Sequence, residues 1–241
     1  MKYSIVNGER SEAQPSLSGH CQTCGSPTIA KCGKVKIWHW AHRGKRMCDP
    51  WWENETEWHR NWKNCFPDNW QERIHTAESG EKHIADIKTI KDWVIEFQHS
   101  HLNPEERRAR NDFYEKLAWV VDGTRRKRDK PKFWESLKEM ATVTNTQSPV
   151  RRILKVLWND CALFREWSGC PAPVFFDFGK EDPMLWCLLP QNSDRETYVL
   201  EFLRAGFITF HRNEIIEKDF FSDLIKNFRT TVAKLSSFSQ E

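Results

Sequence analysis

The stretch that decides the fold runs from residue 84 to residue 98 and contains the two apolar runs Ile84-Ala-Asp-Ile87 and Trp93-Val-Ile-Glu-Phe-Gln98. Both runs are short and rich in β-branched or aromatic residues, and a polar connection joins them, which is typical of a strand hairpin. Residues two apart on a strand point to the same face, so Glu96 and Gln98 project together. A hairpin would place Asp86 beside them. The sequence therefore predicts two carboxylates and an amide at one end of a sheet.

Carboxylates that lie close together repel, and burying them costs several kcal/mol unless a cation sits between them. Oxygen ligands of this kind suit Mg²⁺ or Mn²⁺, with water molecules completing the coordination shell. A metal ion held there would activate a water molecule and neutralise phosphate charge. The alternative is that Asp86, Glu96 and Gln98 form the solvent-facing side of an ordinary antiparallel hairpin, and spacing alone favours this alternative.

Helices are predicted on both sides of the hairpin. Residues 55–65 carry two tryptophans four apart, which is a helical spacing, and a proline at position 67 ends this helix. Asn103 and Pro104 predict the start of a second helix, and residues 118–122 predict a buried strand. On the first helix, Glu55, His59 and Lys63 lie at four-residue steps on one stripe, which is also what a solvated face looks like.

The chain after about residue 124 shows packing patterns but no functional motif. Residues 133–140 predict one helix, and residues 150–157 predict another from apolar residues spaced on one helical face. The runs 174–178, 184–188 and 207–210 predict strands. These patterns indicate a folded extension of the first part of the chain, and periodicity by itself does not show its function.

One run of basic residues interrupts an otherwise balanced composition. The formal net charge is only +3, which says little about partners. The run Arg125-Arg126-Lys127-Arg128 is the exception, with further lysines close behind it. Such a run is usually a solvated loop, and the sharper hypothesis is a loop that contacts phosphate groups of a nucleic acid.

The N-terminal 50 residues contain a cluster of cysteine and histidine residues. Cys21 and Cys24 have the C-x-x-C spacing of a zinc knuckle, and a structural zinc site needs four ligands in a tetrahedron. We favour Cys21, Cys24, His42 and Cys48 as the ligands of a structural Zn²⁺. Cys32 and His39 are possible substitutes, and the alternative is a set of reduced core thiols without a metal.

The cysteines also bear on the compartment. No apolar stretch approaches the roughly 20 residues that a membrane span needs, and the first residues lack the apolar core of a secretory signal. We therefore expect a cytoplasmic protein with no membrane partner. In that compartment the thiols are reduced, and clustered cysteines bind metal rather than form disulfides.

A series of short motifs follows the chain through its first half. In order, these are Trp38-His-Trp-Ala-His42, Cys48-Asp-Pro-Trp-Trp-Glu53, Glu55-Thr-Glu-Trp-His59 with Lys63, His83-Ile-Ala-Asp86, Val94-Ile-Glu-Phe-Gln-His-Ser100, Glu105-Glu106 with Arg110 and Tyr114, and Trp119-Val-Val-Asp-Gly123. This ordered set resembles the CoiA-like competence protein family and is far more specific than any one member.

The resemblance implies a nuclease of the PD-(D/E)xK superfamily, with a mixed α/β sheet flanked by helices and a small N-terminal Cys/His zinc-type module. Carried over by position, Asp86 and Glu96 would be the ligands of a catalytic Mg²⁺ or Mn²⁺. Glu55 and His59 would be a helix-borne acid and its polar companion. Gln98 stands where the superfamily more often has lysine, which puts the water-activating role in doubt.

The sequence thus predicts a module over residues 1–50 and a nuclease-like domain over 51–241, with an extension from about residue 124. Its substrate would be single- or double-stranded DNA, used in competence, DNA processing or defence. Lys63, Arg110 and the basic run are candidate phosphate contacts. Two rival hypotheses are a non-catalytic DNA-binding module with a degenerate nuclease fold, and a zinc-dependent interaction protein.

Overall fold

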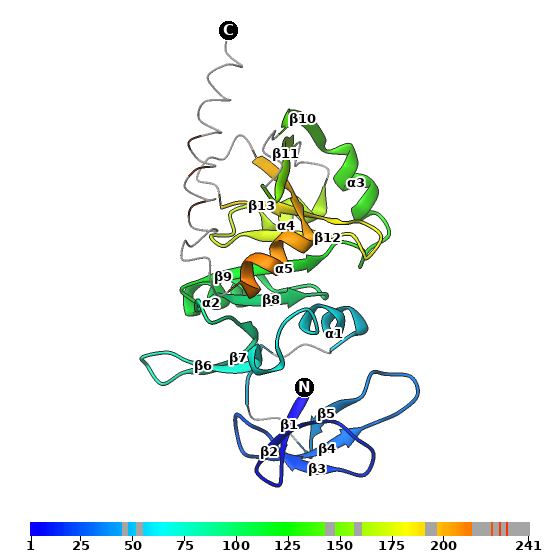
Figure 1. Cartoon of the computed structure of the whole chain (residues 1–241), viewed down its shortest axis with the longest axis vertical. Coiled ribbons are helices and arrows are strands. Elements are labelled where there is room, and N and C mark those ends of the chain that lie inside the picture. The colour runs from blue at the N-terminus through cyan, green and yellow to red at the C-terminus, as the bar shows by residue number, and fades with distance from the viewer. Residues whose placement is uncertain are drawn as a thin grey trace. The chain divides into compact units, whose positions relative to one another are not determined.

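The chain is described by a computed structural model over residues 1–44, 48–51, 55–142, 148–156, 161–190 and 197–213, with residues 223, 227 and 230. It forms two compact units, Met1–Val121 and Asp122–Glu241 (Figure 1). Within the described residues, no helix is long and apolar enough to cross a membrane.

The first unit begins with a small antiparallel sheet in the strand order β2-β1-β3-β4-β5. Its strands are β1 (Tyr3–Val6), β2 (Glu9–Glu12), β3 (Ser18–His20), β4 (Pro27–Lys31) and β5 (His39–His42). Asn7 and Gly8 join β1 to β2 with positive φ angles of 51° and 86°, as an Asn-Gly hairpin turn requires. Trp40 is 1% exposed and centres a small core that includes Met1 and Cys21.

The rest of this unit is a mixed sheet with helices. Its elements are α1 (Glu57–Lys63), the 3₁₀ turn η1 (Asp68–Trp70), β6 (Gln71–Thr76), β7 (Lys82–Lys88), β8 (Val94–Gln98), α2 (Pro104–Phe113) and β9 (Leu117–Asp122). The strand order is β9-β8-β7-β6. Strands β6, β7 and β8 pair antiparallel, whereas β8 and β9 pair in parallel. The predicted mixed α/β architecture is confirmed, and β6 is a strand that we did not predict.

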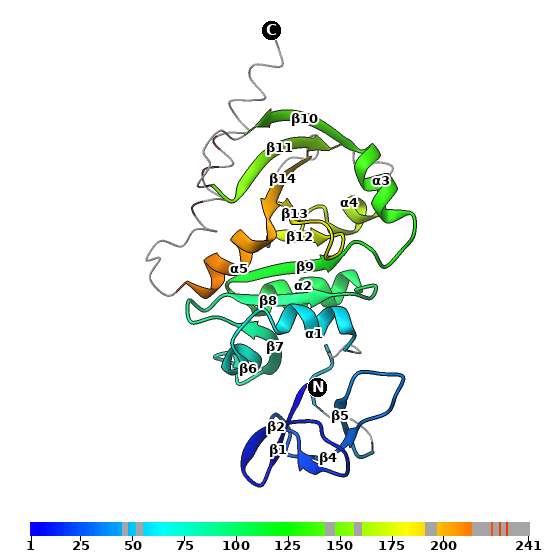
Figure 2. The ribbon, with the colours of Figure 1, turned by 45° about the vertical axis from the view of Figure 1, so that its right-hand side comes forward.

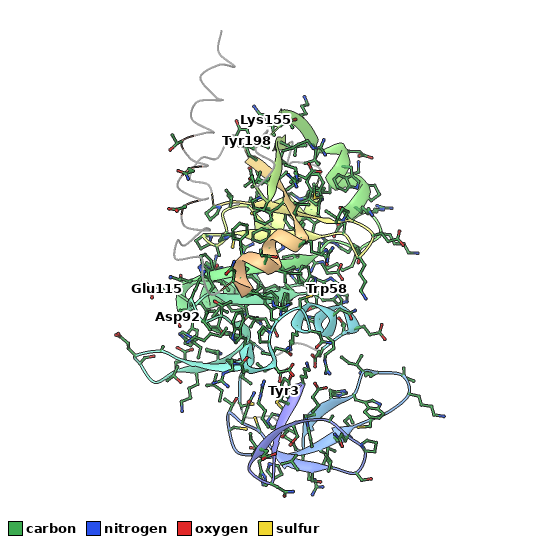
Figure 3. All side chains as sticks on the ribbon, viewed as in Figure 1. Tyr3, Trp58, Asp92, Glu115, Lys155 and Tyr198 are labelled. Carbon is green, nitrogen blue, oxygen red and sulfur yellow. The ribbon has the colours of Figure 1, made fainter. Side chains whose placement is uncertain are left out.

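Strand β8 is buried at every position, because elements cover both of its faces. On one face, the Phe97 ring stacks on Trp62 of α1 at 5.6 Å and meets Trp58 edge-on at 6.2 Å. Figures 2 and 3 show α1 beside β8, with Trp58 on that helix. Thr56 caps α1, and Asn103 caps α2 with proline in its first turn. Local capping and aromatic packing therefore fix the helices against the hairpin.

Within its described residues, the second unit contains an antiparallel sheet with short helices. It contains α3 (Asp129–Glu135), β10 (Leu137–Thr142), β11 (Val150–Val156), α4 (Ala162–Trp167), β12 (Val174–Asp177), β13 (Met184–Leu188), β14 (Thr197–Leu203) and α5 (Arg204–Arg212). The strand order is β10-β11-β14-β13-β12. Phe133 packs on Phe164 at 5.0 Å and on Trp186 at 5.6 Å, so an aromatic cluster fills this core.

Three predictions for this unit were wrong. Residues 150–157 were predicted as a helix, but Val150–Val156 is a strand paired on both sides. The register shift between Val150 and Arg152 breaks the alternation that marks a strand, which leaves a helix-like spacing. The predicted helix over 133–140 ends at Glu135 and gives way to β10. The predicted strand 207–210 lies in α5, where Phe207 and His211 share a buried face.

Candidate metal centre and acidic pocket

The four favoured zinc ligands come together at one point of the N-terminal sheet. One ligand atom from each of Cys21, Cys24, His42 and Cys48 lies within 4.8 Å of all the others. The His42 Nε2 atom is 3.4 Å from Cys24 Sγ and 3.5 Å from Cys48 Sγ, and Cys21 Sγ is 4.0 Å from Cys48 Sγ. Zinc bonds of about 2.0–2.3 Å in a tetrahedron separate ligands by about 3.3–3.8 Å. This Cys₃His cluster therefore fits a zinc ion.

Local backbone geometry produces this cluster. The Cys21 carbonyl accepts the Gly25 amide at 2.9 Å, and the Cys21 amide donates to Ser26, which closes a tight turn. Gly25 takes a φ of +68°, a value that favours glycine. His42 ends β5 beside this turn. Of the two substitutes, His39 lies on β5 with its Nδ1 atom 2.9 Å from the Ile37 carbonyl, and neither His39 nor Cys32 belongs to the cluster.

The thiols carry the electrostatic signs of a cation site. Burial raises the pKa of Cys24, but hydrogen bonds with Ser26 and His42 outweigh it and lower this pKa to about 6. Burial and the neighbouring Cys21 and Cys24 raise the pKa of Cys48 to about 12. A second thiolate beside Cys24 is therefore disfavoured, and a bound cation would remove that cost.

Next to this cluster, a pocket of about 280 Å³ opens between the N-terminal sheet and the hairpin. The N-terminal sheet contributes the whole of β5 and Cys48 to its lining. The other side supplies polar groups from α1, α2, the strands and the segment before α1, namely Asp49, Glu55, His59, Lys63, Glu72, Asp86, Glu96 and Arg110. The predicted acids and the predicted metal module thus face one cavity within the first unit.

Asp86 and Glu96 are the acids that β7 and β8 bring to this pocket. The Asp86 carboxylate is 22% exposed and accepts the Phe97 amide at 3.0 Å. Glu96 is 4% exposed, and one of its oxygens accepts a hydrogen bond from Arg110 at 2.9 Å. Its other oxygen, Oε1, is buried with no hydrogen-bond partner among the described residues. A buried carboxylate oxygen without a donor is the feature that a metal ligand would show.

The charge on Glu96 is disfavoured. Burial, with a further contribution from Asp86, raises the pKa of Glu96 to about 8 against the opposing effect of Arg110. Asp49 adds to the same negative potential. Neighbouring carboxylates of this kind favour either a proton or a cation between them.

Lys63 forms ion pairs with three carboxylates from different parts of the chain. Its ammonium group lies 3.1 Å from Asp86, 3.0 Å from Glu72 and 3.5 Å from Glu55. Burial lowers the pKa of Lys63, but the three acids outweigh it, so the ammonium stays charged. Burial likewise raises the pKa of Glu55, yet Lys63 and Arg60 hold it below its usual range. Glu55 and Lys63 of the predicted stripe therefore belong to a buried charge network and not to a solvated face. Glu55 was predicted on the helix, but it directly precedes the N-cap Thr56 of α1.

Glu72 is a member of this network that sequence reasoning missed. It lies in β6 with a φ of +45°, between the paired residues Gln71 and Arg73. Its carboxylate accepts the backbone amides of Lys2 at 2.6 Å and Tyr3 at 3.1 Å. Glu72 therefore ties the N-terminal sheet to the pocket, and no motif marks it in the sequence.

Asp49 was also missed. One oxygen accepts the Ile84 amide at 2.7 Å, and the other lies 3.0 Å from His83 Nδ1. The His83 ring stacks on Trp51. Asp49 directly follows Cys48 of the cluster, and Ile84 lies in β7 two residues before Asp86. Asp49 therefore links the cluster to the part of β7 that carries Asp86. Its place in the Cys48-Asp-Pro motif was the available signal.

The remaining predicted site residues lie in different surroundings. His59 lines the pocket and donates from Nε2 to the Phe97 carbonyl at 3.0 Å, which fixes β8 against α1. Gln98 is 2% exposed and donates from its amide nitrogen to the Ser100 carbonyl at 3.1 Å. Gln98 is not part of the pocket lining. The hairpin thus brings Asp86 and Glu96 into the pocket without Gln98.

The basic run lies in the second unit and is partly neutralised there. Arg125 and Arg126 both form ion pairs with Glu166, and Arg126 also pairs with Asp129. Lys127 and Arg128 are exposed. The four residues therefore divide into two that hold α4 and two that face solvent.

These features define a mixed α/β protein with a Cys₃His cluster, of a geometry that fits a metal ion, beside an acidic pocket. Residues 11–50 match the family model described as competence protein CoiA, N-terminal domain. This match contains all four clustered ligands and confirms the CoiA-like resemblance seen in the sequence. Comparison with curated proteins and with solved structures gave no match.

Proposed function

We propose that this chain is a metal-dependent nuclease of the PD-(D/E)xK kind that hydrolyses phosphodiester bonds in DNA. The observation that carries the proposal is the convergence of Asp86 and Glu96 from neighbouring strands on one pocket, with Glu96 Oε1 lacking a hydrogen-bond partner among the described residues. The match to a CoiA domain suggests a competence-related role, in which the substrate would be DNA taken up or processed.

The donor set fits a hard divalent cation. Asp86 and Glu96 offer carboxylate oxygens, and Asp49 lines the same pocket. Mg²⁺ or Mn²⁺ binds through one or two carboxylates and keeps several water molecules. When bound, such an ion supplies an ionised water molecule and neutralises phosphate charge.

The protein groups around the acids have positioning roles in this proposal. Lys63 brings a buried ammonium to Asp86, and this cation takes over the charge that a lysine at position 98 would provide. Arg110 holds Glu96 in place, and His59 fixes the backbone at Phe97. Gln98 then supports the hairpin through Ser100 and does not contact substrate.

A second function is favoured by one specific observation. Lys63 already pairs with Asp86 and Arg110 with Glu96, so each of the two acids has a cationic partner without a metal ion. Such a site suits a DNA-binding module that keeps the fold but has lost the chemistry. Cation binding and cleavage separate the two functions.

The test is to incubate the zinc-containing protein with single-stranded DNA, duplex DNA and RNA, with Mg²⁺, with Mn²⁺ and with neither. Manganese binding is measured in parallel by electron paramagnetic resonance, with Asp86→Asn and Glu96→Gln as nearly isosteric variants. We expect cleavage that needs the added cation, and one manganese site that both variants weaken. Binding of DNA without a manganese site and without cleavage would support the binding module, and the absence of both DNA binding and cleavage would contradict both functions.

A further inference from the structure

The segment between β4 and β5 has an unusual surface. Residues 31–38, Lys31-Cys-Gly-Lys-Val-Lys-Ile-Trp38, carry three lysines and no acid. All three lysines are exposed. Among the residues that the structure describes, large hydrophobic side chains are exposed at four positions, and two of these, Val35 at 97% and Trp38 at 47%, lie in this segment.

This segment leads to the acidic pocket. A second pocket, of about 320 Å³, is lined by Val35, Lys36 and Ile37. It shares Met1, His39 and Glu55 with the acidic pocket, and His39 directly follows Trp38. Arg60 of α1 donates to the Trp38 carbonyl at 3.1 Å, which anchors the end of the segment. A ligand that lies on residues 31–38 would therefore continue along β5 into the acidic pocket.

The charge of this path suits a polyanion. Glu55 lies in both linings, but Arg60 and Lys63 neutralise it. The exposed Glu57 also lines the second pocket, but residues 31–38 carry three exposed lysines against this one acid. Lysines that track a phosphate backbone, combined with an exposed indole face for a base, are the elements of single-strand recognition.

The recessed acids select against a duplex. Glu96 is 4% exposed, so a phosphodiester must enter the pocket to meet it. Duplex DNA has a persistence length of about 50 nm and its bases are stacked inside, so it neither bends into such a pocket nor offers a free base to Trp38. A single strand bends into the pocket and also offers a free base to Trp38.

We propose that residues 31–38 form a platform for single-stranded DNA, with a base stacked on Trp38 and phosphates on Lys34 and Lys36. This inference rests on the proposed nuclease function and names its substrate class. It also assigns binding to a part of the chain distant in sequence from the basic run at 125–128.

The experiment measures binding of a labelled 12-nucleotide oligo(dT) and a 12-base-pair duplex by fluorescence anisotropy. The full-length protein keeps its zinc, and no Mg²⁺ or chelator is added, so binding is read without cleavage. The variants are Trp38→Ala, Trp38→Phe and Lys34→Ala/Lys36→Ala. The matched control is Lys82→Ala/Lys180→Ala, which removes two exposed lysines elsewhere.

We expect the single strand to bind at least about tenfold more tightly than the duplex, and Trp38→Ala to weaken its binding at least about fivefold. Trp38→Phe keeps an aromatic face and should stay close to wild type. The Lys34/Lys36 variant should lower the slope of log K against log salt by about 1.4, because each single-strand phosphate contact contributes about 0.7. The control should leave the slope unchanged.

Equal affinity for duplex and single strand, or wild-type affinity in Trp38→Ala with normal zinc content, would overturn the platform. The two proposals fail separately. The expected binding pattern without any cleavage contradicts the nuclease and supports the platform. Cleavage by a Trp38→Ala variant that binds normally contradicts the platform alone.

Discussion

The Lys63 ammonium group lies 3.1 Å from the Asp86 carboxylate, although Lys63 belongs to α1 and Asp86 to β7. Lys63 is buried, and this contact places a fixed positive charge at the proposed metal site. It explains how the site could function with glutamine at position 98. The cation comes from a helix that packs on the hairpin and not from the hairpin itself.

We therefore predict that Lys63→Met abolishes most cleavage, whereas Gln98→Ala retains it to within about tenfold. Losing the Lys63 charge leaves three carboxylates unbalanced, and breaking a buried ion pair costs about 3–5 kcal/mol of stability. The measurement is a single-turnover cleavage rate below the melting temperature of each variant. Lys63→Arg serves as the charge-conserving control and should recover part of the rate. A Gln98→Ala protein without activity would return the catalytic role to position 98.

The Cys₃His cluster should hold about one equivalent of zinc in protein purified without chelator, because one tetrahedral site uses four ligands. Cys24→Ser should lose zinc and lower the melting temperature, since structural zinc contributes folding free energy. Cys32→Ser is the matched control, because Cys32 lies outside the cluster. Elemental analysis that finds no zinc in the wild type, or equal loss in both variants, would contradict this assignment.

The raised pKa of Glu96 predicts how stability depends on pH when no divalent cation is added. The unfolded carboxyl titrates near pH 4.3, whereas burial raises the folded pKa to about 8. Between these values the folded state binds more protons, so the free energy of unfolding falls as pH rises through this window, by on the order of a few kcal/mol. Below about pH 4.3 the contribution is constant.

Glu96→Gln isolates this effect, since it cannot ionise. Denaturant titrations at pH 5 and pH 8 give the free energy of unfolding of the variant and of the wild type. From pH 5 to pH 8, the variant should become more stable relative to the wild type. A difference that is the same at both pH values would mean that Glu96 ionises normally in the folded protein.

Asp49 should connect the metal cluster to β7. Asp49→Ala removes the acceptor of the Ile84 amide and the partner of His83, so we expect a loss of about 1–3 kcal/mol of stability. Zinc content should stay near one equivalent, because Asp49 is not a ligand. Manganese affinity should fall because β7 carries Asp86. Elemental analysis and a manganese titration check both outcomes, and unchanged manganese affinity would contradict the connection.

Local signals in the sequence were enough for part of this site. The alternation in residues 93–98, the Asn103 cap and the C-x-x-C knuckle each depend on near neighbours, and the structure contains all three. The choice of His42 and Cys48 over His39 and Cys32 also matches the observed cluster.

The parts that were missed depend on contacts between distant residues. Glu72 matters because its carboxylate accepts the backbone amides of Lys2 and Tyr3, some 70 residues away in the chain. The strand Val150–Val156 is fixed by pairing with β10 and β14, while its irregular register imitates a helical spacing. Gln98 shares a strand with Glu96, but its hydrogen bond to Ser100 turns it away from the role that position alone suggested.

The central claim is that Asp86 and Glu96 form a cation-dependent cleavage site, and one measurement tests it most directly. It is the single-turnover rate of cleavage of a labelled single-stranded DNA at saturating Mg²⁺, for wild type, Asp86→Asn, Glu96→Gln and the control Glu81→Gln. Glu81 is an exposed residue directly before β7 that pairs with His83 and lies outside the pocket lining. We expect both pocket variants to lose at least about 100-fold with zinc content unchanged, and Glu81→Gln to cleave like the wild type. Cleavage that persists in Asp86→Asn and Glu96→Gln would contradict the claim.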